Sequence, residues 1–245
     1  MKRLLILDLN GILIHRIYKK DYIKYQKLFQ NEFNNFTLTQ PRFKGNFCIW
    51  FRPNVQQFIS WCLEHFNVAI WSSVQKHNME PLLETLLPTE DDRSKLLFWW
   101  HQENCLMEEN SNKNEAGKQS TSFYKVLDEV WKRVDLEEKW LIEQPGENWR
   151  QQTLMIDDNK TKVRDNPQFT SIHPRTWKLF DIIESTGDES AKLKIYDDHT
   201  LEDDGPLKKW LQQLLEWKGS VPEYVEQHPY VDPPIKEKTT DWDDD

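Results

Sequence analysis

Four polar side chains come directly after apolar runs of the sequence and have the types needed for phosphate chemistry. The runs and the residues that follow them are Leu4–Leu7 with Asp8, Val68–Trp71 with Ser72, and Thr153–Ile156 with Asp157 and Asp158. Clustered carboxylates offer the hard oxygen ligands that Mg²⁺ takes, together with water and a substrate phosphate. Because such a cation shields the phosphate charge, an anionic Asp8 can attack phosphorus and form an aspartyl-phosphate. The pattern therefore indicates metal-assisted phosphoryl transfer.

The hydroxyl of Ser72 fits the same chemistry. A helical pattern starts at about Gln75, so this hydroxyl would lie just before a helix N-terminus, where backbone N–H groups also bind phosphate oxygens. A lysine would neutralise the remaining charge. Taken singly, these residues have simpler interpretations, because the Asp8–Gly11 segment is typical of a turn and the pair Asp157-Asp158 can cap a helix.

The apolar runs are typical of parallel strands that are buried on both faces. In open α/β sheets the active site lies beyond the carboxyl ends of the strands, so the three runs would bring their polar residues to one crevice. Leu96–Trp99 is a less regular strand candidate, and 169–172 and 193–196 are short ones. Helical patterns cover about 53–66, 75–87, 123–134 and 206–217. The sequence predicts an α/β fold, with a parallel sheet flanked by helices.

We expect a single domain over residues 1–232, with two insertions. The first, about 16–48, is polar, aromatic and weakly periodic, and it is interpreted as an excursion from the sheet. The second, about 106–122, has almost no apolar content over 107–121 and is predicted to be a mobile loop. Residues 233–245 are predicted to be a disordered acidic tail.

Composition narrows the class of protein. The chain has 245 residues, of which 38% are hydrophobic, which suffices for one α/β domain with insertions. It contains no apolar run as long as a membrane span, and Met1–Arg3 leads directly into the first strand, so we expect neither a membrane segment nor a signal peptide. Three cysteines without a C-x-x-C motif fit reduced thiols in the cytoplasm or nucleus. The net charge of −9 argues against a nucleic-acid binder, and the oligomeric state stays open.

In this order, the motifs resemble the haloacid dehalogenase superfamily, which implies a Rossmann-like parallel sheet with small insertions. More narrowly, Leu7–His15 is similar to the L-D-L-D-E-T-L-V-H box of the FCP-type, or NLI-interacting-factor-like, phosphatases that act on the RNA polymerase II tail. Segments similar to further family motifs are Phe51–Phe58, Phe66–Ser73, Phe123–Leu127, Ile156–Asn159, Asn166–Pro167 and Ile172–Pro174. Val221–Val225 resembles a tail of plant-type members, so the resemblance covers roughly residues 4–228.

The resemblance implies a role for each matched position. Asp8 would be the nucleophile. The positions that would hold or flank Mg²⁺ are Asp8, the backbone carbonyl of Asn10, Asp157 and Asp158. Ser72 and Lys125 would bind the phosphate. A lysine on a helix is usually solvated, however, and Lys118 or Lys132 could take the place of Lys125.

Asn10 departs from the family pattern, because the family has its general acid–base aspartate at this position. An amide can neither protonate a departing alkoxide nor take a proton from water, and such help is typically worth about 10²–10⁴-fold in rate. We therefore expect an impaired Mg²⁺-dependent phosphatase for phosphoserine or phosphothreonine in proteins. The alternative is a catalytically inactive pseudophosphatase, similar to the presequence-translocase receptor, that binds a phosphorylated protein or peptide segment.

Overall fold

A five-stranded parallel sheet forms the centre of the protein. The computed structural model describes residues 2–34, 38–113, 119–141, 148–184 and 191–237. The strand order is β10-β9-β1-β5-β6, and every neighbouring pair is parallel. The strands are β1 Leu4–Leu7, β5 Asn67–Trp71, β6 Phe98–Trp100, β9 Thr153–Ile156 and β10 Ser171–Ile172. The parallel sheet and the strand nature of all three apolar runs are therefore confirmed.

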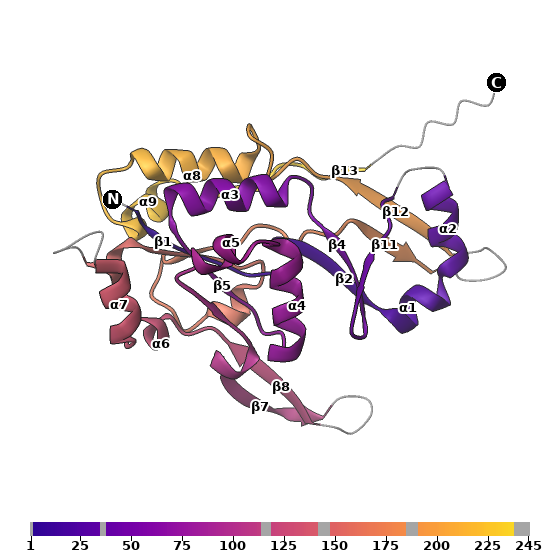
Figure 1. Cartoon of the computed structure of the whole chain (residues 1–245), viewed down its shortest axis with the longest axis horizontal. Helices are drawn as coiled ribbons and strands as arrows, with labels where there is room; N and C mark the ends of the chain where they lie inside the picture. Colours follow the sequence, from indigo (N-terminus) through magenta and orange to yellow (C-terminus); the bar gives the residue numbers. More distant parts are fainter. Residues whose placement is uncertain (1, 35–37, 114–118, 142–147, 185–190, 238–245) are drawn as a thin grey trace.

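Helices cover both faces of this sheet (Figure 1). They are α3 Val55–His65, α4 Lys76–Leu86, α5 Glu90–Ser94, α6 Leu127–Trp131, α7 Val134–Leu141, α8 Pro206–Glu216 and α9 Val221–Gln227. Leu5 and Leu7 of β1 share one buried cluster with residues of α3, α4, α8 and α9. Leu4 and Ile6 point the other way, into a cluster with residues of α6 and α7. Because alternate residues of β1 pack on opposite layers, the fold is a helix–sheet–helix α/β arrangement.

The first insertion adds a small antiparallel sheet beside the main one. Its elements are β2 Ile14–Tyr18, α1 Lys19–Lys24, α2 Gln26–Asn34, β3 Arg42–Lys44 and β4 Phe47–Phe51, with strand order β2-β4-β3. A second three-stranded sheet joins β11 Phe180–Ile183, β12 Lys192–Asp197 and β13 Lys236–Glu237. Phe29, Trp50 and Phe180 form one buried cluster that connects the two small sheets.

One prediction about the second insertion and one about the helix that follows it were wrong. The expected loop forms a hairpin of β7 Leu106–Lys113 and β8 Gln119–Tyr124. A ladder of backbone hydrogen bonds can form in a polar sequence, which is why composition did not indicate it. The helix expected from 123 begins only at Leu127. Lys125 lies before it in extended chain, where its backbone N–H donates to the Lys162 carbonyl oxygen at 2.7 Å.

The predicted disordered tail starts too early. β13 pairs antiparallel with β12, and both oxygens of the Asp232 carboxylate accept from the Arg175 backbone N–H at 2.9 and 3.0 Å. Backbone pairing with β12 thus places residues 236 and 237 in a strand, whereas residues 238–245 of the predicted tail lie outside the described residues. The remaining short elements are the 3₁₀ helices Gln102–Asn104, Trp149–Gln152 and Lys160–Val163. Within the described ranges, none of the helices has the length and apolar character needed to span a bilayer.

We predict that His15 makes the stability of the protein depend on pH. Burial, with a smaller effect of Lys178, lowers the pKa of His15 from 6.5 to about 4, and its Nδ1 accepts from the Leu179 backbone N–H at 3.1 Å. Because the unfolded chain binds this proton at a higher pH, stability falls as the pH drops from 6.5 to 4. Between pH 7 and 5.5 the His15 contribution should be about 1 kcal/mol.

Urea unfolding at these two pH values tests the His15 prediction. The pH-dependent loss of stability should shrink in His15→Gln and stay unchanged in the control His77→Gln, because His77 is exposed. Equal pH dependence in wild type and His15→Gln would contradict it.

Candidate active site

Asp8 lies buried at the carboxyl end of the central strand. Only 1% of its surface is exposed, and its backbone N–H donates to the Ile156 carbonyl oxygen at 2.9 Å, which fixes it against β9. Its Oδ1 atom accepts from the Leu9 backbone N–H at 2.7 Å. Its Oδ2 atom is buried and makes no hydrogen bond within the described part of the chain. One carboxylate oxygen is therefore held in place while the other is left available.

Lys125 is the cation closest to Asp8. Its buried ammonium Nζ lies 2.9 Å from Asp8 Oδ1 and 2.6 Å from Asp157 Oδ2. Burial alone would raise the pKa of Asp8, but Lys125 and then Lys162 outweigh it, so that pKa is lowered. Burial alone would likewise lower the pKa of Lys125, yet Asp8 and Asp157 keep it raised. Both groups are thus charged at neutral pH.

The alternative lysines are not placed in this network. Lys132 is exposed and pairs with Glu129 at 2.9 Å, and Lys118 lies outside the described residues. The Asn166 side chain hydrogen-bonds to the backbone of the segment that carries Lys125. Its Nδ2 donates to the Lys125 carbonyl oxygen at 2.9 Å, and its Oδ1 accepts from the Leu127 N–H at 2.7 Å.

The three aspartates form a group that can hold a cation. Asp8, Asp157 and Asp158 each offer a ligand atom, and these atoms lie within 4.8 Å of one another. Burial raises the pKa of Asp158, a side-chain hydrogen bond from Thr176 opposes the rise, and the charges of Asp8 and Asp157 add to it. Lys125 already pairs with Asp157 Oδ2 and Asp8 Oδ1. Asp158 forms no ion pair with the described residues and remains available to a cation. This donor set fits Mg²⁺.

Asn10 lies in the turn after Asp8. Its Oδ1 atom is buried without a hydrogen bond in the described structure. The turn itself is rigid, because the Gly11 N–H donates to the Ile14 carbonyl oxygen at 2.9 Å and the Gly11 carbonyl oxygen accepts from Trp177 at 2.7 Å. Gly11 has φ of 85°, and a Cβ there would lie 2.3 Å from Asp158 Oδ2, so only glycine fits. The turn that contains Asn10 therefore has a fixed position next to Asp158.

Ser72 directly follows β5, the parallel neighbour of β1, as the sequence predicts. It is buried, and its backbone N–H donates to the Trp100 carbonyl oxygen at 3.0 Å. Its side chain makes no hydrogen bond to Asp8 or Lys125 among the contacts of the described chain. Its place at the same sheet edge is compatible with phosphate binding, and that role stays a prediction.

Sequence reasoning missed two cations and one hydroxyl at this site. Lys162 Nζ, which is 28% exposed, lies 3.9 Å from Asp8 Oδ2. Burial lowers the pKa of Arg16 in β2, and the negative charge of Asp8 opposes this shift. Thr176 contacts Asp158 from the segment after β10. The two cations occur in stretches that contain several other basic residues, so their types alone gave no signal.

Comparison with known proteins identifies a family. The sequence profile of the NLI interacting factor-like phosphatases matches residues 3–202. A Schizosaccharomyces pombe protein described as an uncharacterised FCP1 homology domain-containing protein is 25% identical over 169 residues. That alignment covers 68% of this chain and 58% of the relative, so the chain spans little more than half of that protein's length. The predicted plant-type character stays a prediction.

This chain is similar to parts of two solved structures. One is the fission yeast RNA polymerase II CTD phosphatase Fcp1 bound to beryllium fluoride, at 14% identity and a TM-score of 0.47. The other is a structure of Fcp1, described as an essential RNA polymerase II CTD phosphatase, at 15% identity and a TM-score of 0.45. Both alignments cover 92% of this chain, but only 54% and 52% of the solved chains.

Proposed function

Because the chain belongs to the NLI interacting factor-like phosphatase family, we propose that it is a Mg²⁺-dependent phosphatase of phosphoserine or phosphothreonine in proteins. The observation that carries the proposal is the buried network at the sheet edge. Lys125 Nζ bridges Asp8 and Asp157 at 2.9 and 2.6 Å, and Asp8 Oδ2 is left without a hydrogen bond. An anionic carboxylate with one free oxygen and a neighbouring cation is what nucleophilic attack on a phosphate requires.

Each residue has a role in this mechanism. Asp8 Oδ2 attacks phosphorus, and the phosphoryl group moves from the serine oxygen to Asp8. Lys125 and Ser72 bind the phosphate oxygens, and Lys162 adds positive charge on the Oδ2 side of Asp8. The Mg²⁺ ion would be held by the Asp158 carboxylate and by the Asn10 backbone carbonyl, with Asp8 and Asp157 beside it, and it would shield the phosphate charge.

Asn10 limits the rate of both half-reactions in this mechanism. When the bond to phosphorus breaks, an alkoxide leaving group needs a proton, and an amide cannot supply it. When the aspartyl-phosphate hydrolyses, the attacking water must lose a proton, which an amide cannot accept. Slow attack on the phosphate and a persistent aspartyl-phosphate on Asp8 follow from the same substitution.

We predict that aryl phosphates are cleaved faster than alkyl phosphates, because an aryloxide leaves without protonation. Steady-state assays of p-nitrophenyl phosphate and phosphoserine peptides with Mg²⁺ measure the two rates. Intact-protein mass spectrometry should show a phosphorylated fraction with the aryl substrate. Asp8→Asn, which has no nucleophile, should show neither turnover nor phosphorylation. Equal steady rates on both substrates, with no phosphorylated Asp8, would sink the proposal of impaired catalysis.

The second candidate is a pseudophosphatase that binds a phosphorylated segment without turnover. The observation that favours it is the amide of Asn10 at the acid–base position, whose Oδ1 atom is buried without a hydrogen bond in the described structure. Calorimetry with Mg²⁺ separates the two candidates, since a binding module has no need of the metal. Mg²⁺ affinity that is lost in Asp158→Asn supports the enzyme, and its absence in wild type supports the binding module.

A further inference from the structure

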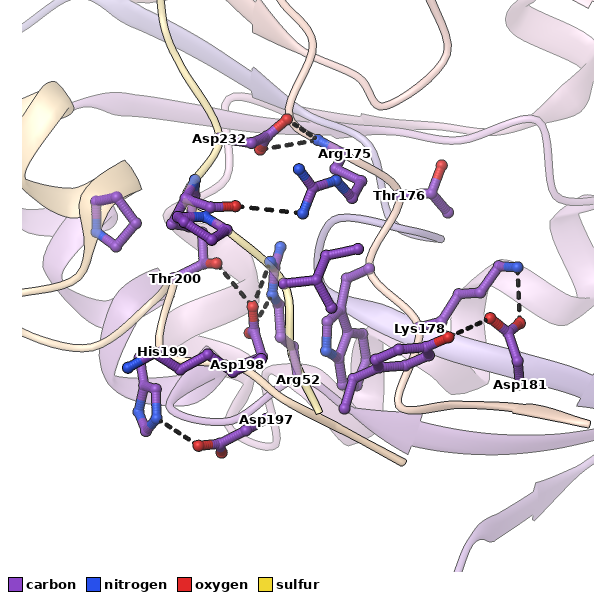
Figure 2. A pocket seen from close by; sticks show the side chains of 17 residues that line it. Arg52, Arg175, Thr176, Lys178, Asp181, Asp197, Asp198, His199, Thr200 and Asp232 are labelled. Atoms are coloured by element: carbon purple, nitrogen blue, oxygen red, sulfur yellow. Dashed lines mark hydrogen bonds and ion pairs between the residues drawn. The ribbon is translucent and has the colours of Figure 1, made fainter. Parts of the chain in front are cut away.

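Figure 2 shows a cavity of about 420 Å³ whose lining includes Thr176, the residue that contacts Asp158 of the candidate active site. The segment Arg175–Lys178 forms one wall, and the C-terminal segment Asp232–Lys236 forms another. Trp177 and Tyr196 supply aromatic surface, while Pro233 and its neighbours supply apolar surface. The Asp232–Lys236 segment lies outside the residues that match the family, 3–202. The cavity is therefore built partly from a segment that the family match does not include.

The carboxylates that line this cavity are already engaged as acceptors. Asp198 accepts from Arg52 Nε at 2.7 Å and from Nη2 at 2.9 Å. Asp181 accepts from Lys178 at 2.8 Å and from the Tyr196 hydroxyl at 2.7 Å. The same holds for the other two, since Asp197 contacts His199 and Asp232 accepts from the Arg175 backbone. Each of the four carboxylates therefore already has at least one hydrogen-bonding partner within the protein.

Several hydrogen-bond donors of the residues that line the cavity, in contrast, have no carboxylate partner among the described residues. Trp177 is 5% exposed, and its Nε1 atom is buried without an acceptor in the described structure. The Arg175 guanidinium makes one hydrogen bond, from Nη1 to the Pro233 carbonyl oxygen at 3.2 Å, and pairs with no carboxylate of the described residues. In Figure 2 it lies between Asp232 and the Arg52–Asp198 pair. Lys236 lines the cavity and has no ion pair within the described chain. Arg175 and Lys236 are exposed cations without a carboxylate partner among the described residues, and this favours a negatively charged ligand.

Thr176 connects the cavity with the aspartate cluster, because it lines the cavity and its side chain hydrogen-bonds to Asp158. The Thr176 Cγ2 atom would lie 3.1 Å from a Cβ on Gly11, which is three residues after Asp8. In the same segment, His173 Nδ1 lies 2.8 Å from the Asp157 carbonyl oxygen. Since an extended peptide advances about 3.3–3.6 Å per residue, a residue a few positions from the phosphorylated one can reach the cavity.

We propose that this cavity is a subsite for an acidic side chain of the substrate peptide, a carboxylate or a second phosphate, near the phosphorylated residue. The assignment rests on the proposed function, which places the phosphorylated residue at Asp8. Arg175 and Lys236 supply the donors, and the aromatic and proline surfaces contact the aliphatic part of the side chain. The size is sufficient, because pockets of about 300–1,000 Å³ hold whole small ligands.

A scan with nine-residue peptides tests the subsite. Each peptide carries a central phosphoserine, one glutamate that moves through the other positions, and alanine elsewhere. Fluorescence anisotropy with the full chain in Mg²⁺ measures affinity, and mass spectrometry confirms that the peptide stays intact. One register should bind about tenfold tighter than the all-alanine peptide, since hydrogen bonds to charged groups are worth this much. A second phosphoserine in that register should bind at least as tightly if phosphate is the preferred acid.

Variants decide whether the cavity is responsible. The gain should disappear in Lys236→Gln, whose side chain is exposed enough to be replaced without loss of folding, and in Arg175→Gln. Lys192→Gln is the matched control, because Lys192 is exposed on the same small sheet but does not line the cavity. No register effect, or a gain that survives in Lys236→Gln, would overturn the assignment. A Lys236-dependent gain without any hydrolysis would keep the subsite and remove the phosphatase proposal.

Discussion

Replacing Asn10 with aspartate is expected to raise the rate of phosphoserine peptide hydrolysis by about 10²–10⁴-fold, the usual worth of general acid–base catalysis. The substitution changes one atom of a side chain whose Oδ1 is already buried without a partner. Backbone hydrogen bonds of Gly11 to Ile14 and Trp177 make the turn rigid. We therefore expect the new carboxyl to take the position of the amide. In aryl phosphate hydrolysis the gain should come from the second half-reaction alone, because an aryloxide leaves without protonation.

Asn159→Asp is the matched control for Asn10→Asp. It makes the same chemical change near the site, but the Asn159 Oδ1 atom caps a 3₁₀ helix by accepting from the Thr161 N–H at 3.0 Å. A new carboxylate there adds charge without reaching the acid–base position. Steady-state rates of wild type and both variants on aryl and alkyl substrates give the answer. A silent wild type rescued by Asn10→Asp would favour the binding module, and silence of all three would remove the phosphate chemistry.

The parallel sheet and the spatial proximity of the aspartates could be predicted from the sequence for one physical reason. Strands buried on both faces must be apolar throughout, so β1, β5 and β9 are visible as continuous runs. Their polar successors then have to meet at the carboxyl edge, as Asp8, Asp157 and Asp158 do within 4.8 Å. The amphipathic helix α8 was equally clear, because its buried residues recur at helical spacing.

The parts that sequence could not predict depend on tertiary contacts between polar residues. The hairpin β7–β8 is held by its backbone ladder, which leaves no apolar pattern. Lys162 approaches Asp8 because a 3₁₀ turn after β9 brings it there, and any of several lysines would look alike in the sequence. The ordered stretch from Asp232 to Glu237 depends on the backbone of Arg175 and on strand β12, far away along the chain.

Lys125→Met is expected to destabilise the protein by about 3–5 kcal/mol, the usual cost of breaking a buried ion pair by removing one partner. Lys125 is 1% exposed and contacts two carboxylates, Asp8 and Asp157, that are as deeply buried. Its loss leaves two close negative charges without the cation that lowers the pKa of Asp8. The variant should therefore also lose phosphoryl transfer, since the remaining carboxylates repel the phosphate.

Urea unfolding of a small set of variants tests this expectation. Lys162→Met is the control, since a cation 28% exposed and 3.9 Å from Asp8 Oδ2 should contribute less than about 1 kcal/mol. The double variant Asp8→Asn with Lys125→Met should be more stable than Lys125→Met alone, because it removes one of the two unpaired charges. Added Mg²⁺ should stabilise Lys125→Met more than wild type, as the cation then compensates both aspartates. Equal losses in Lys125→Met and Lys162→Met would mean that the buried network does not carry the stability of this site.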